Sequence, residues 1–247
     1  MKRQWIFGLL AACLLSGCAS SAAGQPRETN FFAMDTTMHF TVYGESSLLD
    51  EAKALVTGLE EQLSVTAETS ALHTINRTGA GTLTGAAADL MAESLALCQR
   101  TGGALDLSIY PVVRAWGFTT GRYQIPPRET LDALLSHVDH TRIRLDAETG
   151  TLSLPAGMQI DLGSVAKGYV GRQAAQLLRE HGVTSALLNL GGNIQAIGSK
   201  PDGTLWKIAV QDPNGGAPIL VLSVQDQAVV TSGDYERCRL LAGKPRL

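Results

Sequence analysis

The chain has few cysteines, no excess of basic charge and no long apolar run. Its four cysteines among 247 residues do not form a pattern of zinc ligands. Lysine and arginine number 20 against 23 acidic residues, which gives a formal net charge of -3. Proteins that bind a nucleic-acid backbone carry a basic surplus. These shortages exclude a zinc-finger module and argue against nucleic acid as a partner.

The apolar run at the N-terminus is too short to cross a bilayer, which takes roughly 20 residues. It extends from Trp5 to Leu15 and follows Lys2 and Arg3. A positive start, a short apolar stretch and small residues after it are typical of an export signal. The run ends in Leu15-Ser16-Gly17-Cys18, which resembles the lipobox of bacterial lipoproteins.

We therefore expect residues 1–17 to be a signal peptide and Cys18 to carry lipid, including palmitate, after cleavage. The alternative is an ordinary signal peptide that happens to contain a cysteine. Each buried methylene of an acyl chain contributes about 0.8 kcal/mol, so several chains hold a domain at a membrane. Residues 18–30 are mostly small and polar and are predicted to form a lipidated tether. The predicted location is a lipid anchor in the cell membrane, on the extracytoplasmic or periplasmic face.

Two cysteines remain outside this leader, Cys98 and Cys238. Cys98 lies in an apolar helical stretch, where a buried free thiol is the commoner outcome. A disulfide between the two in an oxidising compartment is the alternative.

The apolar pattern predicts a globular α+β fold, with a mixed, largely antiparallel sheet and packed helices. Hydrophobic residues make up 45% of the chain, enough for one large core or two small ones. Helical spacing predicts helices over Ser47 to Leu63, Ala86 to Arg100, Leu131 to Val138 and Val165 to His181. Strands are predicted over Phe40 to Tyr43, Arg142 to Leu145, Thr151 to Leu154, Gln159 to Asp161, Ala186 to Leu190, Trp206 to Gln211 and Ile219 to Val224. Neighbouring strands read as hairpins, which disfavours a doubly wound parallel sheet.

The stretch from Ile160 to Tyr169 (IDLGSVAKGY) places polar groups where a strand passes into a helix. Backbone N–H groups at a helix start attract phosphate, and Lys167 adds a cation one turn in. Asp161 can accept hydrogen bonds from a base or ribose. The alternative is that Asp161 or Ser164 caps the helix and Lys167 is a solvated surface residue. The spacing matches neither a Walker motif nor a dinucleotide-binding fingerprint.

Residues 161–168 (DLGSVAKG) closely resemble the central signature of the FAD:protein FMN transferases, a family historically linked to thiamine biosynthesis. The resemblance covers nearly all of Phe31 to Arg237 and implies a flavin transferase-like fold. Its other motifs, in family order, are Phe32-Ala33-Met34 with Thr36-Thr37, Leu63-Ser64-Val65-Thr66 with Ser70 and Asn76, Leu105-Asp106-Leu107-Ser108, Ala115-Trp116-Gly117-Phe118, Leu188-Asn189-Leu190-Gly191-Gly192-Asn193 and Thr231-Ser232-Gly233-Asp234-Tyr235-Glu236-Arg237.

The resemblance implies which residues contact the substrate FAD and the metal. Ser164 matches a position that contributes an oxygen to Mg²⁺, a cation that prefers oxygen ligands. Trp116 offers a flat apolar face for a ring, with core packing as the alternative. The positions that match FAD contacts are Met34, Thr66, Ala115, Trp116, Gly117, Asp161 and Lys167.

The implied activity is transfer of FMN from FAD to a threonine of an acceptor flavoprotein, with release of AMP and dependence on Mg²⁺. The acceptor would carry a short threonine-containing flavinylation motif and belong to a sodium-pumping or electron-transfer complex, or be an exported flavoprotein. Two alternatives remain, an extracytoplasmic lipoprotein that binds FAD without catalysis and a Mg²⁺-dependent FAD pyrophosphatase.

The chain departs from the family pattern at three places. Asp35 replaces a usual glycine and Thr66 stands where many members have tyrosine, and both changes are expected to weaken FAD binding. After Arg237 the family continues through a histidine-containing segment and further metal ligands. We expect residues 31–237 to form an incomplete domain and residues 238–247 a divergent tail, with transfer impaired in these 247 residues. No catalytic residue is assigned, and His39, His73, His137, His140 and His181 are expected at the surface or satisfied in the core.

Overall fold

The computed structural model describes residues 24–232, 239–241 and 244–246. Its centre is a five-stranded sheet in the order β1-β2-β6-β7-β10, in which every neighbouring pair is antiparallel. These strands are β1 (Arg27–Ala33), β2 (Thr36–Val42), β6 (Ala186–Leu190), β7 (Asn193–Ile197) and β10 (Ala228–Val230). The mixed helix and sheet architecture with antiparallel pairing confirms the predicted α+β fold.

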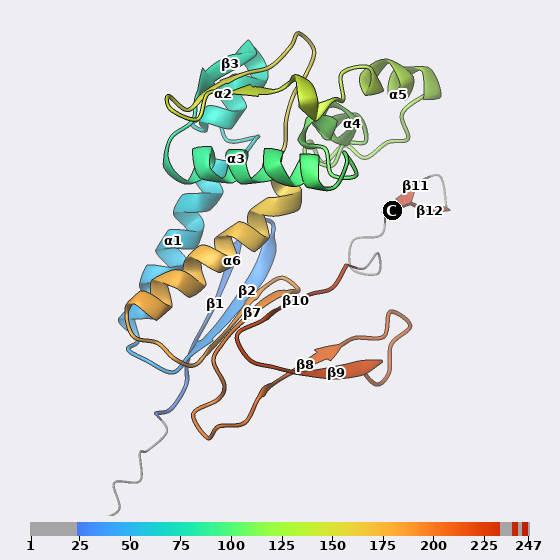
Figure 1. Ribbon diagram of the computed structural model, residues 1–247. Helices are drawn as coiled ribbons and strands as arrows, with labels where there is room; N and C mark the ends of the chain where they lie inside the picture. The colour runs from blue at the N-terminus through green and yellow to red at the C-terminus, as the bar shows by residue number, and fades with distance from the viewer. Residues whose placement is uncertain (1–23, 233–238, 242–243, 247) are drawn as a thin grey trace, which may run out of the picture.

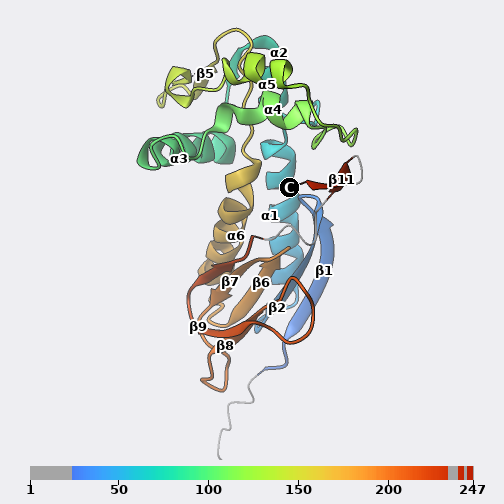
Figure 2. The ribbon, with the colours of Figure 1, turned by 90° about the vertical axis from the view of Figure 1, so that its right-hand side faces the viewer.

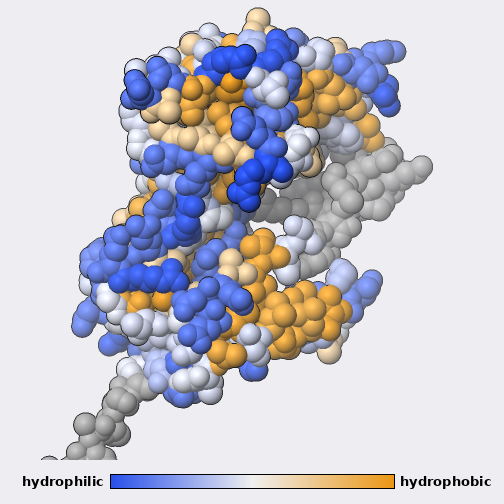
Figure 3. Space-filling model, viewed as in Figure 1, coloured by the Kyte–Doolittle hydropathy of each residue, from blue (hydrophilic) through white to orange (hydrophobic). Residues whose placement is uncertain are grey.

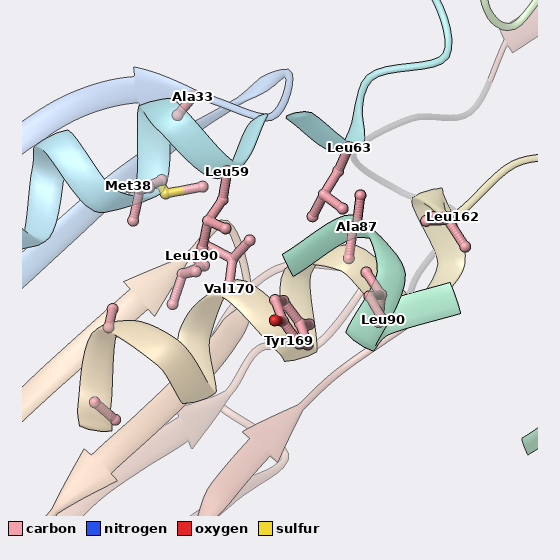
Figure 4. Packing of buried hydrophobic residues seen from close by; sticks show 14 of the residues in the cluster. Ala33, Met38, Leu59, Leu63, Ala87, Leu90, Leu162, Tyr169, Val170 and Leu190 are labelled. Carbon is pink, nitrogen blue, oxygen red and sulfur yellow. The ribbon is translucent and has the colours of Figure 1, made fainter. Parts of the chain in front are cut away.

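Two long helices, α1 (Ser47–Leu63) and α6 (Gly163–Glu180), lie side by side over one face of this sheet (Figures 1 and 2). They bury a large core with alternate residues of the strands, because side chains of a strand point to opposite faces in turn. Figure 4 shows Met38 and Leu190 of the sheet close to Leu59 of α1 and Val170 of α6. This packing fixes the position at which α6 begins.

The other face of the sheet is covered in part by a hairpin of β8 (Trp206–Val210) and β9 (Leu220–Val224). Trp206, Ile208 and Val224 form a small second core there with Ala196 of β7. The hairpin also carries exposed apolar residues on β9 and just before it, and an apolar patch appears in this region of the space-filling view (Figure 3). Its exposed large residues include Ile219, Leu220, Val221 and Leu222.

The segment between α1 and α6 forms a cap above the sheet (Figure 1). It contains a small sheet in the order β3-β5-β4. Its helices are α2 (Ala71–Thr78), α3 (Gly85–Arg100), the short η1 (Leu107–Ile109), α4 (Tyr110–Ala115), α5 (Arg128–Leu135) and η2 (His140–Arg142). Its strands are β3 (Ala80–Thr82), β4 (Arg144–Leu145) and β5 (Thr151–Ser153). Helix α3 lies across the top of α6, where Leu90 of α3 packs beside Tyr169 of α6 (Figure 4).

The structure differs from the sequence-based elements at two places that matter for the site. Strand β1 begins at Arg27, so Arg27–Asn30 of the expected tether belong to the sheet. The expected strand over Gln159 to Asp161 is wrong, because these residues adopt no regular structure. Instead, Ile160 bonds through its N–H and C=O to the side-chain amide of Asn76, both at 2.8 Å.

Two further strands, β11 (Arg239–Leu241) and β12 (Lys244–Arg246), form an antiparallel pair near the C-terminal end.

Among the described residues, every helix is too short or too polar to span a bilayer. The predicted signal peptide, Cys18 and residues 19–23 of the tether lie outside the described residues, as does Cys238. Cys98 is buried and free.

Candidate functional site

A cavity of about 810 Å³ lies beside the first turns of α6, between that helix, α3 and the turn after β6. This volume is within the range of about 300 to 1,000 Å³ that is usual for small-molecule sites. The lining includes Arg100 of α3, Ser164, Lys167 and Gly168 of α6, Gly191, Gly192 and Asn193 of the turn, and Thr231 after β10. Four separate segments of the chain therefore meet at one hollow.

The start of α6 is held by a carboxylate. Leu162 is the N-cap and provides no side-chain cap. Asp161, two residues before the helix begins, accepts hydrogen bonds from the backbone N–H groups of Gly163 and Leu162. Burial raises the pKa of the Asp161 carboxyl, and these hydrogen bonds offset the rise only in part. Asp161 thus lies where a helix cap lies, and its contact with FAD stays a prediction.

Ser164 and Lys167 lie on the cavity side of α6. The hydroxyl-bearing Ser164 is exposed, and Lys167 is half-buried one turn further on. The N-terminal end of a helix carries a partial positive charge that extends through its first turn. A serine hydroxyl, an ammonium group and the helix end thus favour an anionic ligand such as a diphosphate.

The turn between β6 and β7 requires glycine at both of its central positions. Gly191 has φ of 64° and Gly192 has φ of 85°, the left-handed region that favours glycine. A Cβ on Gly191 would overlap the side chain of Thr36. Asn189 Oδ1 accepts the N–H of Gly192 at 2.9 Å. This tight turn lets Thr36 of β2 approach and directs Asn193 to the cavity.

The turn between β1 and β2 is strained at two residues without glycine's freedom. Met34 has φ of 50° and Asp35 has φ of 58°. Such values are uncommon outside glycine and tend to occur at functional sites. The N–H of Met34 donates to Glu60 Oε1 of α1 at 2.7 Å, which holds the turn over the end of that helix. The strain gives a physical reason for the glycine that the family usually has at the position of Asp35.

The remaining predicted FAD contacts lie in the cap. Ala115 ends α4, and Gln124 donates to the carbonyls of both Ala115 and Trp116. Gly117 has φ of 86°, and a Cβ there would overlap the Arg122 carbonyl. Trp116 is half-buried and lies outside the main core. Thr66 is exposed after α1, in a turn where its N–H donates to Ser64 Oγ.

Of the predicted site residues, the structure brings Ser164 and Lys167 together in the cavity. The others do not line it, namely Met34, Thr66, Ala115, Trp116, Gly117 and Asp161. Most of the other cavity residues had no role assigned from the sequence, among them Arg100, Arg172, Gly192 and Asn193. For Gly192 and Asn193 the sequence did offer a signal, a glycine pair and a polar residue directly after a buried strand.

A second group of family-motif residues is fully hydrogen-bonded. Asp106 accepts from the N–H and hydroxyl of Ser108, at 2.9 and 2.6 Å, and from the N–H of His140 at 2.9 Å. The His140 ring lies 3.2 Å from the same carboxylate. Burial opposes the charge on Asp106, but the bonds from Ser108 and His140 outweigh it and hold its pKa below the usual value. This cluster ties η1 to η2, so His140 is a satisfied interior residue, as expected.

Magnesium fits the cavity only with help from a ligand. Ser164 and Thr231, which line the cavity, each carry a hydroxyl oxygen that could serve as a ligand. Residues 24–232 and the two short C-terminal strands contain no cluster of three His, Cys, Asp or Glu side chains placed for a metal. Mg²⁺ usually keeps several waters and binds through few protein groups plus substrate phosphates, so a hydroxyl beside a diphosphate suits it.

The chain is similar in sequence to enzymes that transfer flavin. A FAD:protein FMN transferase of Treponema pallidum is 31% identical over 262 residues, which cover 94% of this chain and 72% of that protein. The corresponding protein of Haemophilus influenzae is 29% identical, over 94% of this chain and 73% of its own length.

Solved structures agree in fold. The ApbE protein of Thermotoga maritima superposes with a TM-score of 0.84 at 27% identity, over 90% of this chain and 74% of that one. The flavin transferase ApbE of Vibrio cholerae gives 0.77 at 25% identity, over 85% and 72%. The model of the ApbE family matches residues 34–245, which include the signature, the residues that line the cavity and the turns at Met34 and Gly191. This chain therefore belongs to the ApbE family.

Proposed function

We propose that the protein binds FAD and transfers its FMN half to a threonine of a partner flavoprotein, with release of AMP. The observation that carries this proposal is the cavity at the start of α6, which presents Ser164 and Lys167 of the family signature to one hollow. The relatives named FAD:protein FMN transferase support the choice of substrate.

The protein's part in this reaction is to position a diphosphate and neutralise its charge. Phosphoryl transfer needs little covalent chemistry from the enzyme and depends on geometry and electrostatics. The helix start and Lys167 attract the phosphates, while Trp116 offers a ring face in the cap. The threonine oxygen forms a bond to the phosphorus on the FMN side, the bond from that phosphorus to the oxygen of AMP breaks, and the hydroxyl proton is lost to a base.

Magnesium would be held by Ser164 together with phosphate oxygens, and when bound it offsets charge on the phosphoryl oxygens. The proposed location follows from the lipobox-like Leu15 to Cys18, which would anchor the domain at the membrane on its extracytoplasmic face. The proposed partner is an acceptor in that compartment with a short threonine motif, as the resemblance to flavin transferases implies.

The test is an in-gel flavin fluorescence assay with purified protein, FAD, Mg²⁺ and an acceptor that carries the threonine motif. We expect a covalently fluorescent acceptor band and an equal amount of AMP, both lost with EDTA. The rate is compared with that of the Treponema pallidum relative, which serves as the reference enzyme.

Two results would contradict the proposal. Release of FMN and AMP without a labelled acceptor would show a pyrophosphatase. Tight FAD binding with neither product would show a binding lipoprotein. Replacement of the acceptor threonine by valine is the matched control and should abolish the band.

A further inference from the structure

Asn193 is buried at the wall of the cavity, and its side-chain oxygen is unpaired. It is 9% exposed, and its Oδ1 has no hydrogen-bond partner among the described residues. The glycine turn before it fixes its position as the first residue of β7. A buried polar group without a partner costs roughly 1 to 3 kcal/mol, and native structures contain few of them.

The groups around Asn193 favour an anion. Its Nδ2 faces α6, 3.9 Å from where a Cβ of Gly168 would lie. Lys167 and Arg100 line the same cavity, and so do Arg172 and Glu93, which pair with each other at 2.7 Å. The cavity lining therefore carries three cationic side chains and one anionic side chain. It also adjoins the N-terminal end of an 18-residue helix, which is partially positive. The absence of a side chain on Gly168 leaves the approach to the amide open.

The chemistry of an amide narrows the kind of ligand. A carboxamide offers two donors on nitrogen and an acceptor on oxygen, and a turn about χ2 exchanges them. Phosphate oxygens accept the donors, and a neighbouring sugar hydroxyl can donate to Oδ1. A phosphate ester of a sugar or sugar alcohol supplies both groups side by side, whereas an isoalloxazine ring supplies no negative charge for the helix end.

We propose that Asn193 is a binding residue that holds the diphosphate of FAD against the start of α6 and contacts an adjoining sugar hydroxyl. This inference rests on the proposed function, because it takes FAD as the ligand. The ligand would then be contacted from two sides, by Asn193 of strand β7 and by Lys167 of helix α6. The amide oxygen of Asn193 is then unpaired in the free protein and paired when the ligand is bound.

The experiment compares Asn193→Ala and Asn193→Asp with wild-type protein in titrations of FAD, ADP and riboflavin. Asn193→Ala should weaken binding of FAD and ADP about tenfold, because a hydrogen bond to a charged group contributes about 1.5 to 3 kcal/mol. Asn193→Asp should weaken both further, since a carboxylate repels phosphate. Affinity for riboflavin, which has no phosphate, should not change.

A matched control is Ser185→Ala. Ser185 Oγ is the other buried side-chain atom without a partner in the described part of the chain, but Ser185 does not line the cavity. This variant should leave all three affinities unchanged. The melting temperature of ligand-free Asn193→Ala should equal or exceed that of wild type, because the unpaired oxygen is removed.

Three results would overturn the assignment. One is unchanged FAD and ADP affinity in Asn193→Ala. Another is an equal loss for riboflavin, which would place Asn193 against the ring. The third is a lower melting temperature with a uniform loss of binding, which would make Asn193 structural. If wild-type protein binds ADP but no FAD, the proposed function fails while the ADP series still tests the phosphate contact.

Discussion

Two groups of family-motif residues adjoin helix α3 and differ in how completely their polar atoms are paired. At one, the Asp106 carboxylate accepts from the N–H and hydroxyl of Ser108 and the N–H of His140, with the His140 ring alongside. At the other, Asn193 is buried with an unpaired oxygen at a cavity that also exposes Ser164 and Lys167. The first group is complete without a ligand and the second is not.

This difference separates motif residues that we expect to be structural from those that we propose bind a ligand. A saturated cluster stabilises the fold and gains nothing from a ligand. An unsaturated cluster beside a helix start lowers stability slightly in the free protein and gains from a ligand. Changes at Asp106 should therefore affect unfolding, and changes at Lys167 should affect affinity. Substitutions at Gly191, in the turn between β6 and β7, and at Asp35, in the turn between β1 and β2, should change the free energy of unfolding by different amounts.

The largest expected effect is that of Gly191→Ala. The added Cβ would overlap Thr36 and the backbone would be held at a φ of 64°, so we expect a loss of about 3 kcal/mol in the free energy of unfolding. Urea denaturation measures it. Gly203→Ala is the control, because Gly203 has φ of 82° but nothing within 4 Å of the added carbon, and it should cost about 1 kcal/mol. Equal losses in the two variants would contradict the close approach of Thr36.

Asp106→Asn should lower the free energy of unfolding by about 2 kcal/mol at neutral pH, because hydrogen bonds to a charged acceptor are lost. FAD affinity should stay within about twofold of wild type. Asp132→Asn, which breaks only an exposed pair with Arg128, is the control and should cost less than about 0.5 kcal/mol.

The loss of stability in Asp106→Asn should depend on pH. The pKa of Asp106 is lowered in the folded protein, so its contribution is present above the unfolded value near about 4 and is lost as pH falls through the folded value. The difference between wild type and Asp106→Asn should therefore shrink in acid. A difference that stays constant from pH 7 to pH 3 would show that the charge on Asp106 is irrelevant.

The smallest expected effect is that of Asp35→Gly. Glycine adopts a positive φ without strain, and this gain outweighs its greater freedom in the unfolded chain. We therefore expect the free energy of unfolding to rise by about 0.5 kcal/mol, as measured by thermal unfolding. Asp226→Gly is a second variant at a positive φ, and it removes a carboxylate that accepts from Gly198 N–H and Arg179. That variant should be destabilised. A loss of stability in Asp35→Gly as well would show that the Asp35 carboxylate stabilises its turn.

The long elements could be predicted from the sequence because their apolar spacing is unambiguous. The bounds of α1 were predicted in full, and the predicted start of α3 differs by one residue. Helix α2 was not predicted because it is short and polar, although Ser70 caps its start and Gly79 its end. The strand expected over Gln159 to Asp161 fails because Asn76, distant in sequence, takes the backbone bonds of Ile160.

The site was predictable in part. The sequence alone placed Ser164 and Lys167 at a helix start, and the structure shows both at a cavity. It could not show that Asn193 and Arg100 face the same hollow, because they come from a turn and a helix that only the packing of α3 on α6 brings together. It also could not show that the neighbouring motif at Asp106 is internally satisfied, since His140 is 34 residues away.

The most direct test of the cavity as the FAD site is a fluorescence titration of FAD with wild type, Lys167→Ala and Lys207→Ala. Lys207 is exposed on β8 and does not line the cavity, so it controls for loss of one positive charge. We predict that Lys167→Ala binds FAD at least about tenfold more weakly than wild type and that Lys207→Ala binds it equally well. Equal FAD affinity in all three proteins would contradict the account.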